Sequence, residues 1–273
     1  MPFEVRCRVY YWNRRRSWPH RVPVTFHQKL LRKMALDRRP LLTTFSDKVA
    51  VRDYVARVVG SQVLTRLYAV VTDPAALDLS TLPTQFVVKP SHASGMVWIV
   101  EDRDALDRRL LVATSRGWLA TRYADVEQEW AYRRVQARIV IEELLLDADG
   151  HIPPDYKFFV FHGRACLVQV DTDRFGVRRR TLFRPDWTPV DARLTYPPAE
   201  PAPSRPDALD EMTRIAEALG QETDFVRVDL YDVDGRVVFG ELTSYPGGAR
   251  KVFTPESFDV ELGRCCTTPR RYT

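Results

Sequence analysis

Apolar residues recur along the chain with two different periods, one typical of helices and one of strands. The helical period is clearest at 25–36, where apolar residues stand at 26, 30, 31, 34 and 35. A second helix is expected from Ser46, a plausible N-cap, to Gly60, a plausible stop. Helices are predicted at 25–36, 46–60, 103–114 and 207–219.

Between these helices, short apolar runs and alternating segments predict strands. The strands are expected at 85–89, 96–100, 138–145, 156–161, 164–171, 225–232 and 236–243. Several are joined by short turns, so most neighbours should pair antiparallel. The pattern therefore predicts an α+β chain with largely antiparallel sheets and helices between them.

The hairpin at 225–243 carries the most informative polar residues. Alternation along the first strand puts Arg227 and Asp229 on one face, and on the return strand Glu241 and Thr243 share a face. Two carboxylates beside a hydroxyl are hard oxygen ligands that suit Mg²⁺. The alternative is a charged sheet face in contact with water.

The turn of this hairpin constrains that site. A two-residue Asp234-Gly235 loop, the usual form of this dipeptide, would put Glu241 on the opposite face from Asp229. A three-residue loop, 233–235, would instead bring Arg227 opposite Glu241. A shared metal site therefore predicts either an odd loop or a β-bulge.

Two lysines are further candidates for contact with an anion. Lys89 ends an apolar strand and is followed by a loop of small residues, 91–95, whose backbone N–H groups could surround a phosphate. Lys157 alternates with apolar residues on its strand and could point into a cleft or into water. Neither lysine alone distinguishes a functional role from an ordinary strand residue.

Composition narrows the class of protein. The chain has 273 residues, 45% of them hydrophobic and 28% charged, as in globular proteins. We see no membrane-spanning run and no signal peptide, and we read the four cysteines as free thiols, so we expect a cytoplasmic location. There is no zinc-ligand spacing, no G-x-S-x-G and no Walker A motif.

Charge is unevenly distributed. Residues 1–40 carry a formal charge of +9 within a total of +5, so the rest sum to −4. Aromatic residues interleave with the basic ones, and such a segment either binds an acidic polymer or nucleic acid or is a solvated arm. Candidate substrate contacts are Arg14, Arg15, Arg16 and, further along, Arg180.

In this order, the motifs resemble the ATP-grasp superfamily, and the TupA-like branch in particular, over about residues 46–263. The segment at Ser46-Asp-Lys48 resembles the one that brings the first nucleotide lysine, and 82–95 resembles the strand of the second lysine with its glycine-rich loop. Residues 139–145 resemble the hinge that binds adenine. The most specific match is Arg227-x-Asp229 with Glu241-x-Thr243, although Thr243 stands where the family usually has asparagine.

The resemblance implies roles for individual residues. Arg227 and Lys157 would be catalytic, and Asp229, Glu241 and Thr243 would bind magnesium, with two ions expected. The residues expected to bind ATP are Lys48, Lys89, Ser91, Ser94, Gly95, Glu142, Glu143, Leu144, Leu145, Asp155 and Lys157. It also implies a basic segment with a helix at 1–45, an N-terminal lobe at 46–137 with the loop 91–95, and a C-terminal lobe at 138–273.

The implied activity is an ATP-dependent carboxylate–amine ligase that forms an amide or peptide bond through an acyl phosphate. The two lobes would clamp ATP between them. Its substrates would be small molecules or peptides, at least one of them acidic; nucleic acid such as tRNA is conceivable but not expected. Other classes stay open: a kinase or phosphotransferase on the same fold, a glycosyltransferase using the D-x-D at 171–173, or a nucleic-acid-binding protein without catalysis.

Overall fold

The computed structural model describes residues 5, 9, 22–172, 176–269 and 272. No helix in this part of the chain is long and apolar enough to cross a lipid bilayer. The α-helices are α2 (Phe26–Leu36), α3 (Pro40–Ser46), α4 (Ala50–Val59), α5 (Arg108–Leu119), α6 (Tyr123–Glu127), α7 (Leu209–Leu219) and α8 (Glu256–Arg264). The strands are β1 (Leu67–Val71), β2 (Phe86–Pro90), β3 (Trp98–Val100), β4 (Ile139–Glu142), β5 (Asp155–Phe161), β6 (Arg164–Thr172), β7 (Arg179–Phe183), β8 (Val226–Val233) and β9 (Arg236–Thr243).

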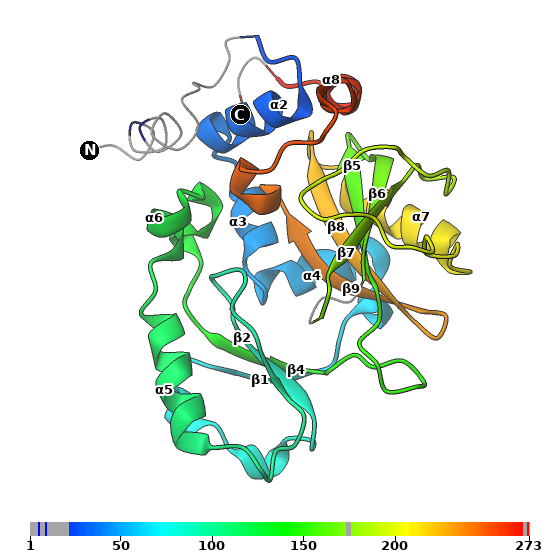
Figure 1. Cartoon of the computed structure of the whole chain (residues 1–273). Helices are drawn as coiled ribbons and strands as arrows, with labels where there is room; N and C mark the ends of the chain where they lie inside the picture. The colour runs from blue at the N-terminus through cyan, green and yellow to red at the C-terminus, as the bar shows by residue number, and fades with distance from the viewer. Residues whose placement is uncertain (1–4, 6–8, 10–21, 173–175, 270–271, 273) are drawn as a thin grey trace.

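The strands form two antiparallel sheets, as the α+β prediction requires (Figure 1). The smaller sheet has the order β1-β4-β2-β3. Alternate residues of β2, such as Phe86 and Val88, are buried beneath α5, where Leu111 joins the same apolar cluster. The intervening residues Val87 and Lys89 are on the other face, which is therefore available for a site.

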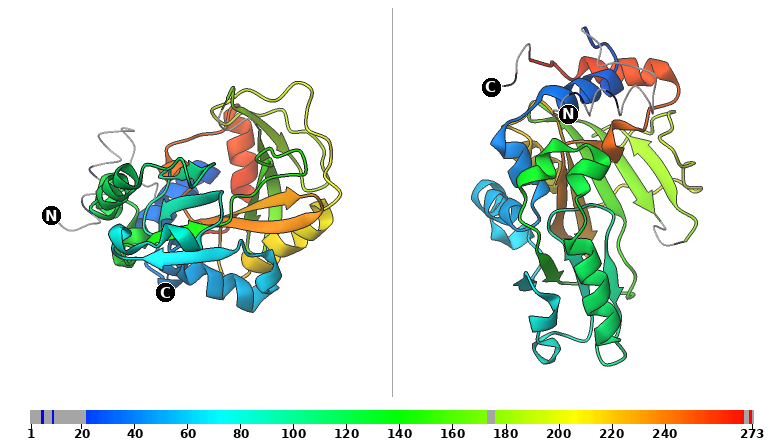
Figure 2. Two further views of the ribbon diagram at one scale, coloured as in Figure 1. Left: turned by 90° about the horizontal axis from the view of Figure 1, so that it is seen from below. Right: turned by 90° about the vertical axis from the view of Figure 1, so that its left-hand side faces the viewer.

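The larger sheet has the order β7-β6-β5-β8-β9 and is covered by helices on both faces. On one face, Phe158 and Val228 belong to a cluster with residues of α4 and α7. On the other face, Phe159 and Phe161 pack against α2 and α8. Figure 2 shows α2 and α8 side by side across the end of this sheet, with the smaller sheet and α5 extending away from it.

Local sequence accounts for the close packing of α2 and α8. Thr25 caps α2: its hydroxyl accepts a hydrogen bond from the Gln28 amide, and the Gln28 side chain accepts one from the Thr25 amide. Gly263 on α8 faces this cap, and a Cβ at that position would lie 2.4 Å from the carbonyl oxygen of Val24. Only glycine allows the two backbones to approach so closely.

The face of the larger sheet beneath α2 and α8 is apolar at one end of its strands and polar at the other. Its apolar end is covered by these helices, whereas its other end carries polar side chains directed toward the smaller sheet. These polar residues lie on β5, β6, β8 and β9 and include Asp155, Lys157, Gln169, Asp229 and Glu241. The two sheets thus enclose a polar region between them.

Several predicted boundaries need correction. The predicted helix 46–60 is α4, which begins only at Ala50; Ser46 is the last residue of the preceding helix α3 and not an N-cap. The predicted helix 103–114 is α5, 108–119, because the Asp107 carboxylate caps the amides of Arg109 and Leu110. Strands β1 and β7 are not among the predicted elements, although the apolar run 67–71 is a strand signal.

The division into lobes also differs at one strand. The predicted boundary at 138 assigns β4 to the C-terminal lobe, but β4 pairs with β1 and β2 in the smaller sheet. Conversely, α4 lies in the predicted N-terminal lobe, yet its residue Val55 packs on the larger sheet. Long-range strand pairing places β4 in the smaller sheet, and burial of apolar side chains places the helix on the larger one. Neither kind of contact between distant segments can be read from the sequence.

Candidate active site

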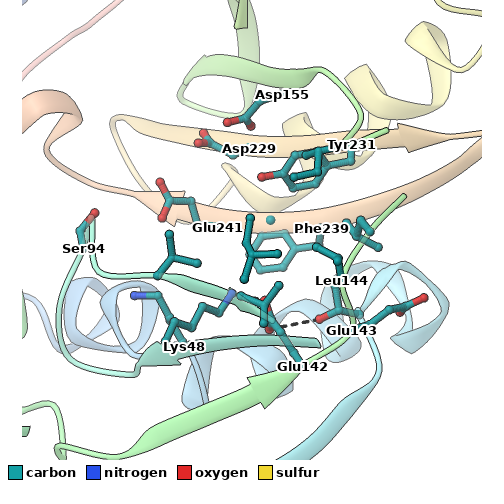
Figure 3. A pocket seen from close by; sticks show the side chains of 18 of the residues that line it. Lys48, Ser94, Glu142, Glu143, Leu144, Asp155, Asp229, Tyr231, Phe239 and Glu241 are labelled. Atoms are coloured by element: carbon teal, nitrogen blue, oxygen red, sulfur yellow. Dashed lines mark hydrogen bonds and ion pairs between the residues drawn. The ribbon is translucent and has the colours of Figure 1, made fainter. Parts of the chain in front are cut away.

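A cavity of about 280 Å³ lies between the two sheets. Its wall from the smaller sheet includes Lys89 and Glu142, and Lys48 joins them from the turn between α3 and α4. Its opposite wall is the polar end of the larger sheet. Figure 3 shows Asp229 and Glu241 on that wall, across the cavity from Lys48.

A single row of paired residues crosses four strands on this wall. Gln169 pairs with Lys157, Lys157 with Asp229, and Asp229 with Glu241. The Lys157 ammonium donates to Asp229 Oδ2 at 2.7 Å and also bonds Asp155. Neighbouring strands lie about 4.8 Å apart, so such a row places its charged groups within direct contact.

The hairpin turn has the commoner of the two predicted lengths. Val233 pairs with Arg236, which leaves Asp234 and Gly235 as a two-residue loop. Both loop residues have positive φ, 52° and 85°, as a type I′ turn requires. The alternative three-residue loop is therefore wrong.

A β-bulge restores the alignment that this turn would otherwise destroy. Leu230 pairs with Phe239 and Asp229 with Glu241, so Gly240 is an extra residue on β9. A Cβ at position 240 would lie 3.1 Å from the carbonyl oxygen of Asp229, which favours glycine there. The bulge turns Glu241 onto the face of Asp229, which confirms the predicted β-bulge; Glu241 lies opposite Asp229 and not opposite Arg227.

Arg227 connects the polar groups at this end of the hairpin. Its guanidinium forms two 2.6 Å bonds to the Asp229 carboxylate, one of 2.9 Å to Glu241 Oε1 and one of 3.1 Å to Thr243 Oγ1. The Thr243 hydroxyl in turn donates to Glu241 at 2.9 Å. Asp229 is buried, with 2% of its side chain exposed, whereas Glu241 has 38% exposed.

The electrostatic environment keeps Glu241 ionised. Burial opposes its charged form, but Arg227, Lys157 and Lys48 outweigh that effect and lower its pKa to about 2. The described residues contain no group of three or more His, Cys, Asp or Glu side chains arranged to hold a metal. The carboxylates of Asp229 and Glu241 could therefore supply two oxygen ligands, with the others coming from a bound molecule.

Lys48 is held in position by backbone contacts. Its amide bonds the Ser91 carbonyl at 3.3 Å, and its ammonium bonds the carbonyl of Ala93. Burial, together with the nearby charge of Lys89, lowers the pKa of Lys48 to about 8. Lys89 forms an ion pair with Glu142.

The predicted phosphate loop 91–95 is only partly a cavity wall. Ser91 is fully buried, its hydroxyl donates to the Gln136 carbonyl at 2.7 Å and accepts from the Arg138 amide at 3.1 Å, and it does not line the cavity. We therefore place Ser91 in the frame of the loop. Ser94 and Gly95 do line the cavity, together with the following residues 96 and 97.

The end of β4 and the segment that follows it, which are predicted to form the hinge, lie along the cavity wall. Residues 142–145 all line the cavity. The carboxylate of Glu142 points inward to Lys89, whereas that of Glu143 accepts from the Arg66 amide at 2.9 Å and from Arg236 at 3.2 Å. Glu143 thus connects this segment to Arg66, the residue before β1, and to Arg236, the first residue of β9.

Some cavity residues were not predicted from sequence. Thr65 donates to Glu142 at 3.3 Å, and Tyr231 and Phe239 line the cavity from the larger sheet. Tyr231 follows Asp229 by two residues, so strand alternation is a signal that could have found it. Thr65 precedes β1, the strand missed in the sequence, and its role could not be inferred without that strand.

Other candidate residues lie elsewhere. Arg180 is not in this cavity; it forms bonds of 2.6 and 2.8 Å with the buried carboxylate of Asp171. That pairing occupies the first acid of the D-x-D sequence, which removes support for a sugar-nucleotide site there. Asp173 and the basic residues Arg14, Arg15 and Arg16 lie outside the described residues.

Comparison with solved structures identifies several ligases of similar fold. An L-amino acid ligase from Bacillus licheniformis is 16% identical with a TM-score of 0.50, and the match covers 90% of this chain and 55% of that one. A D-alanine–D-alanine ligase from Bacillus anthracis complexed with ATP is 18% identical, with a TM-score of 0.44 and coverage of 76% and 56%. The ATP-grasp ligase PsnB, complexed with a variant of its minimal precursor, Mg and ADP, is 13% identical, with a TM-score of 0.44 and coverage of 76% and 52%.

The chain therefore spans little more than half the length of these three proteins. A search of curated proteins found no match. This chain nevertheless shares its fold with the L-amino acid ligase. In this chain, that fold consists of two antiparallel sheets that enclose a polar cavity. A model of the TupA-like ATP-grasp family matches residues 27–266, nearly the whole chain, and this protein belongs to that family.

Proposed function

We propose that this protein is an ATP-dependent carboxylate–amine ligase that works through an acyl phosphate. The observation that supports this most directly is the arrangement of charge in the cavity between the sheets. Lys89, on the smaller sheet, and Lys48 line one wall, and Asp229 and Glu241, on the larger sheet, line the other. Figure 3 shows Lys48 facing Asp229 and Glu241. A nucleoside triphosphate needs cations for its phosphates and, through magnesium, carboxylates as well.

The donor set fits magnesium bound together with nucleotide. Mg²⁺ is usually held by one or two carboxylates plus substrate phosphates, which matches two acidic side chains better than a closed protein cage. Asp229 and Glu241 would hold it, and the number of ions stays a prediction. When bound, the metal supplies positive charge that reduces repulsion between the γ-phosphate and the attacking carboxylate.

The proposed reaction has two steps, formation of the acyl phosphate and its displacement by the amine. A carboxylate oxygen of the acid attacks the γ-phosphorus, the bond from that phosphorus to the bridging oxygen breaks, and ADP leaves. The amine nitrogen then attacks the acyl carbon, phosphate leaves with the former carboxylate oxygen, and the nitrogen loses a proton. Lys48 and Lys89 would hold the phosphates, and Arg227 would stabilise negative charge on the acyl phosphate and on the tetrahedral oxyanion.

Mg-ATP should stabilise the folded protein. A ligand at one hundred times its dissociation constant adds about 2.7 kcal/mol to the free energy of unfolding. For a chain of this size we expect the melting temperature to rise by about 5 °C or more. Mg-GTP should have little effect, since the hinge 142–145 is expected to bind adenine. An unchanged melting temperature in saturating Mg-ATP would contradict nucleotide binding itself.

Product analysis then separates a ligase from a kinase on the same fold. Release of ADP and phosphate should be screened with pairs of amino acids and peptides, and the products examined by mass spectrometry. We expect an amide together with equal amounts of ADP and phosphate. A stable phosphorylated product without any amide would assign the protein to the phosphotransferases.

A further inference from the structure

A second cavity adjoins the first and has a different lining. Its volume is about 320 Å³, and Ser94 contributes to the walls of both cavities. It lies on the same face of the larger sheet, toward α2 and the segment 246–253. Because Arg227 also lines it while bonding Asp229 and Glu241, this cavity reaches the place where the proposed chemistry would occur.

The lining of the second cavity is strongly cationic. Four positive side chains line it, namely Arg178, Arg180, Arg227 and Lys251, and none of its described lining residues is acidic. The buried carboxylate of Asp171, behind the wall, bonds Arg178 at 2.5 Å and Arg180 at 2.6 Å. One carboxylate thus pairs with two guanidinium groups, so the wall formed by Arg178 and Arg180 keeps a net positive charge. Lys251 adds a further positive charge to the cavity.

The arginines of this wall are held in fixed positions. The Tyr196 ring lies against both guanidinium groups, with its centroid 4.8 Å from Arg178 and 5.1 Å from Arg180. Arg180 also donates to the Leu194 carbonyl at 3.1 Å, and only 9% of its side chain is exposed. The Nε of Arg178 is buried without a hydrogen-bond partner among the described residues. Such a fixed wall with a spare donor is suited to binding an anionic group.

The rest of the lining is apolar and aromatic. Phe26, Phe159 and Phe253 pack edge-to-face or tilted, with ring centroids about 6 Å apart, and all three contribute to the cavity. This surface suits the carbon skeleton of an organic molecule and would not suit a hydrated inorganic ion. The cationic wall and the aromatic surface together indicate an organic anion.

The spacing of the cations indicates more than one anionic group. Arg227 is on β8 and Arg180 on β7, and β5 and β6 lie between them. Three strand spacings amount to roughly 14 Å between the backbones. Arg227 bonds Asp229 and Glu241 at one end of this distance, and Arg180 bonds Asp171 at the other, so the two cationic groups stay apart. A molecule between them can therefore carry anionic groups at two separate positions.

We propose that the second cavity binds the acid substrate, and that this substrate carries at least two carboxylates. The reacting carboxylate lies near Arg227, and the second one binds Arg178, Arg180 and Lys251. This assignment rests on the proposed ligase function for the reaction, but the binding preference can be tested without any reaction. The substrate class is therefore an acidic amino acid, an acidic peptide or another dicarboxylate of that size.

The probe is the dipeptide L-Glu-L-Glu, compared with the nearly isosteric L-Gln-L-Gln, which keeps only the terminal carboxylate. Binding is measured by calorimetry on the whole protein with and without the non-hydrolysable Mg-AMPPNP. We expect the wild type to bind L-Glu-L-Glu at least tenfold more tightly. Equal binding of the two dipeptides, or binding of neither, would overturn the proposal.

The variants Arg178→Ala and Lys251→Ala locate the effect. Each should weaken L-Glu-L-Glu binding about tenfold and leave L-Gln-L-Gln and Mg-AMPPNP binding unchanged. Arg180 is avoided because its loss would remove the main partner of buried Asp171. Arg214→Ala on α7, across the sheet, makes the same change of charge and should have no effect.

The two proposals fail in distinguishable ways. If both alanine variants bind L-Glu-L-Glu as the wild type does, the second cavity is not the site of the acid. If L-Glu-L-Glu binds as expected but Mg-AMPPNP does not bind, the cavity assignment stands and the ligase function fails.

Discussion

Replacing Asp229 by asparagine, or Glu241 by glutamine, should lower turnover by about a thousandfold, roughly 4 kcal/mol of transition-state stabilisation. Each change removes one negative charge at the end of the row that faces Lys48 and Lys89, and with it a proposed magnesium ligand. The shape of the side chain is preserved, and Arg227 keeps its contact with the other carboxylate. We therefore expect a folded protein that is impaired in chemistry.

Steady-state release of ADP and circular dichroism on the same samples measure both properties. Glu211→Gln, on α7 and exposed, makes the same change of charge away from the cavity and should be fully active. The melting temperature of Asp229→Asn should fall more than that of Glu241→Gln, because Asp229 is buried. A Glu241→Gln variant with wild-type turnover would show that the pair does not form the site.

Affinity for Mg-ATP should fall as the pH rises through 8. In the protein without nucleotide, the pKa of Lys48 is about 8, so its ammonium group is charged below this pH and neutral above it. If only the charged form binds the phosphates, the dissociation constant should be about tenfold larger at pH 9 than at pH 7. Calorimetric titrations between pH 7 and pH 9 measure this slope directly.

Two variants identify the group responsible. Lys48→Arg keeps a charge throughout this range and should abolish the slope. Glu129 is a second group that titrates here, since burial and then the charge of Glu127 raise its pKa to about 8. Glu129→Gln should leave the slope intact. A slope that survives in Lys48→Arg and disappears in Glu129→Gln would assign the titration to the carboxyl group.

The most specific part of the site was predictable because it is local. Strand alternation placed Arg227 beside Asp229, and the length of the Asp-Gly turn required an irregularity before Glu241 could join them. The apolar residues of β9 also carry this information, because Val237 and Phe239 are two apart in the core whereas Leu242 follows after three. That change from even to odd spacing marks the bulge.

What could not be predicted depends on contacts between distant segments. Ser91 was predicted to be a phosphate-loop residue, but its hydroxyl bonds the backbone of Gln136 and Arg138, which lie 45 and 47 residues further along the chain, just before β4. The second cavity unites residues from Phe26 to Phe253, and no motif connects them. Arg180 was a candidate from sequence, yet its neighbours Arg178 and Tyr196 become relevant only once β7 and its loop are placed.

Ser94 belongs to the walls of both cavities, so we expect the occupancies of the two cavities to be thermodynamically linked. A displacement of Ser94 when one cavity fills would change the shape of the other. Such linkage is reciprocal: the factor by which nucleotide alters the affinity for the acid equals the factor by which the acid alters the affinity for nucleotide. The order in which the two ligands arrive would then affect only the rates, and we expect a nucleotide bound alone to be held differently from one bound together with its reaction partner.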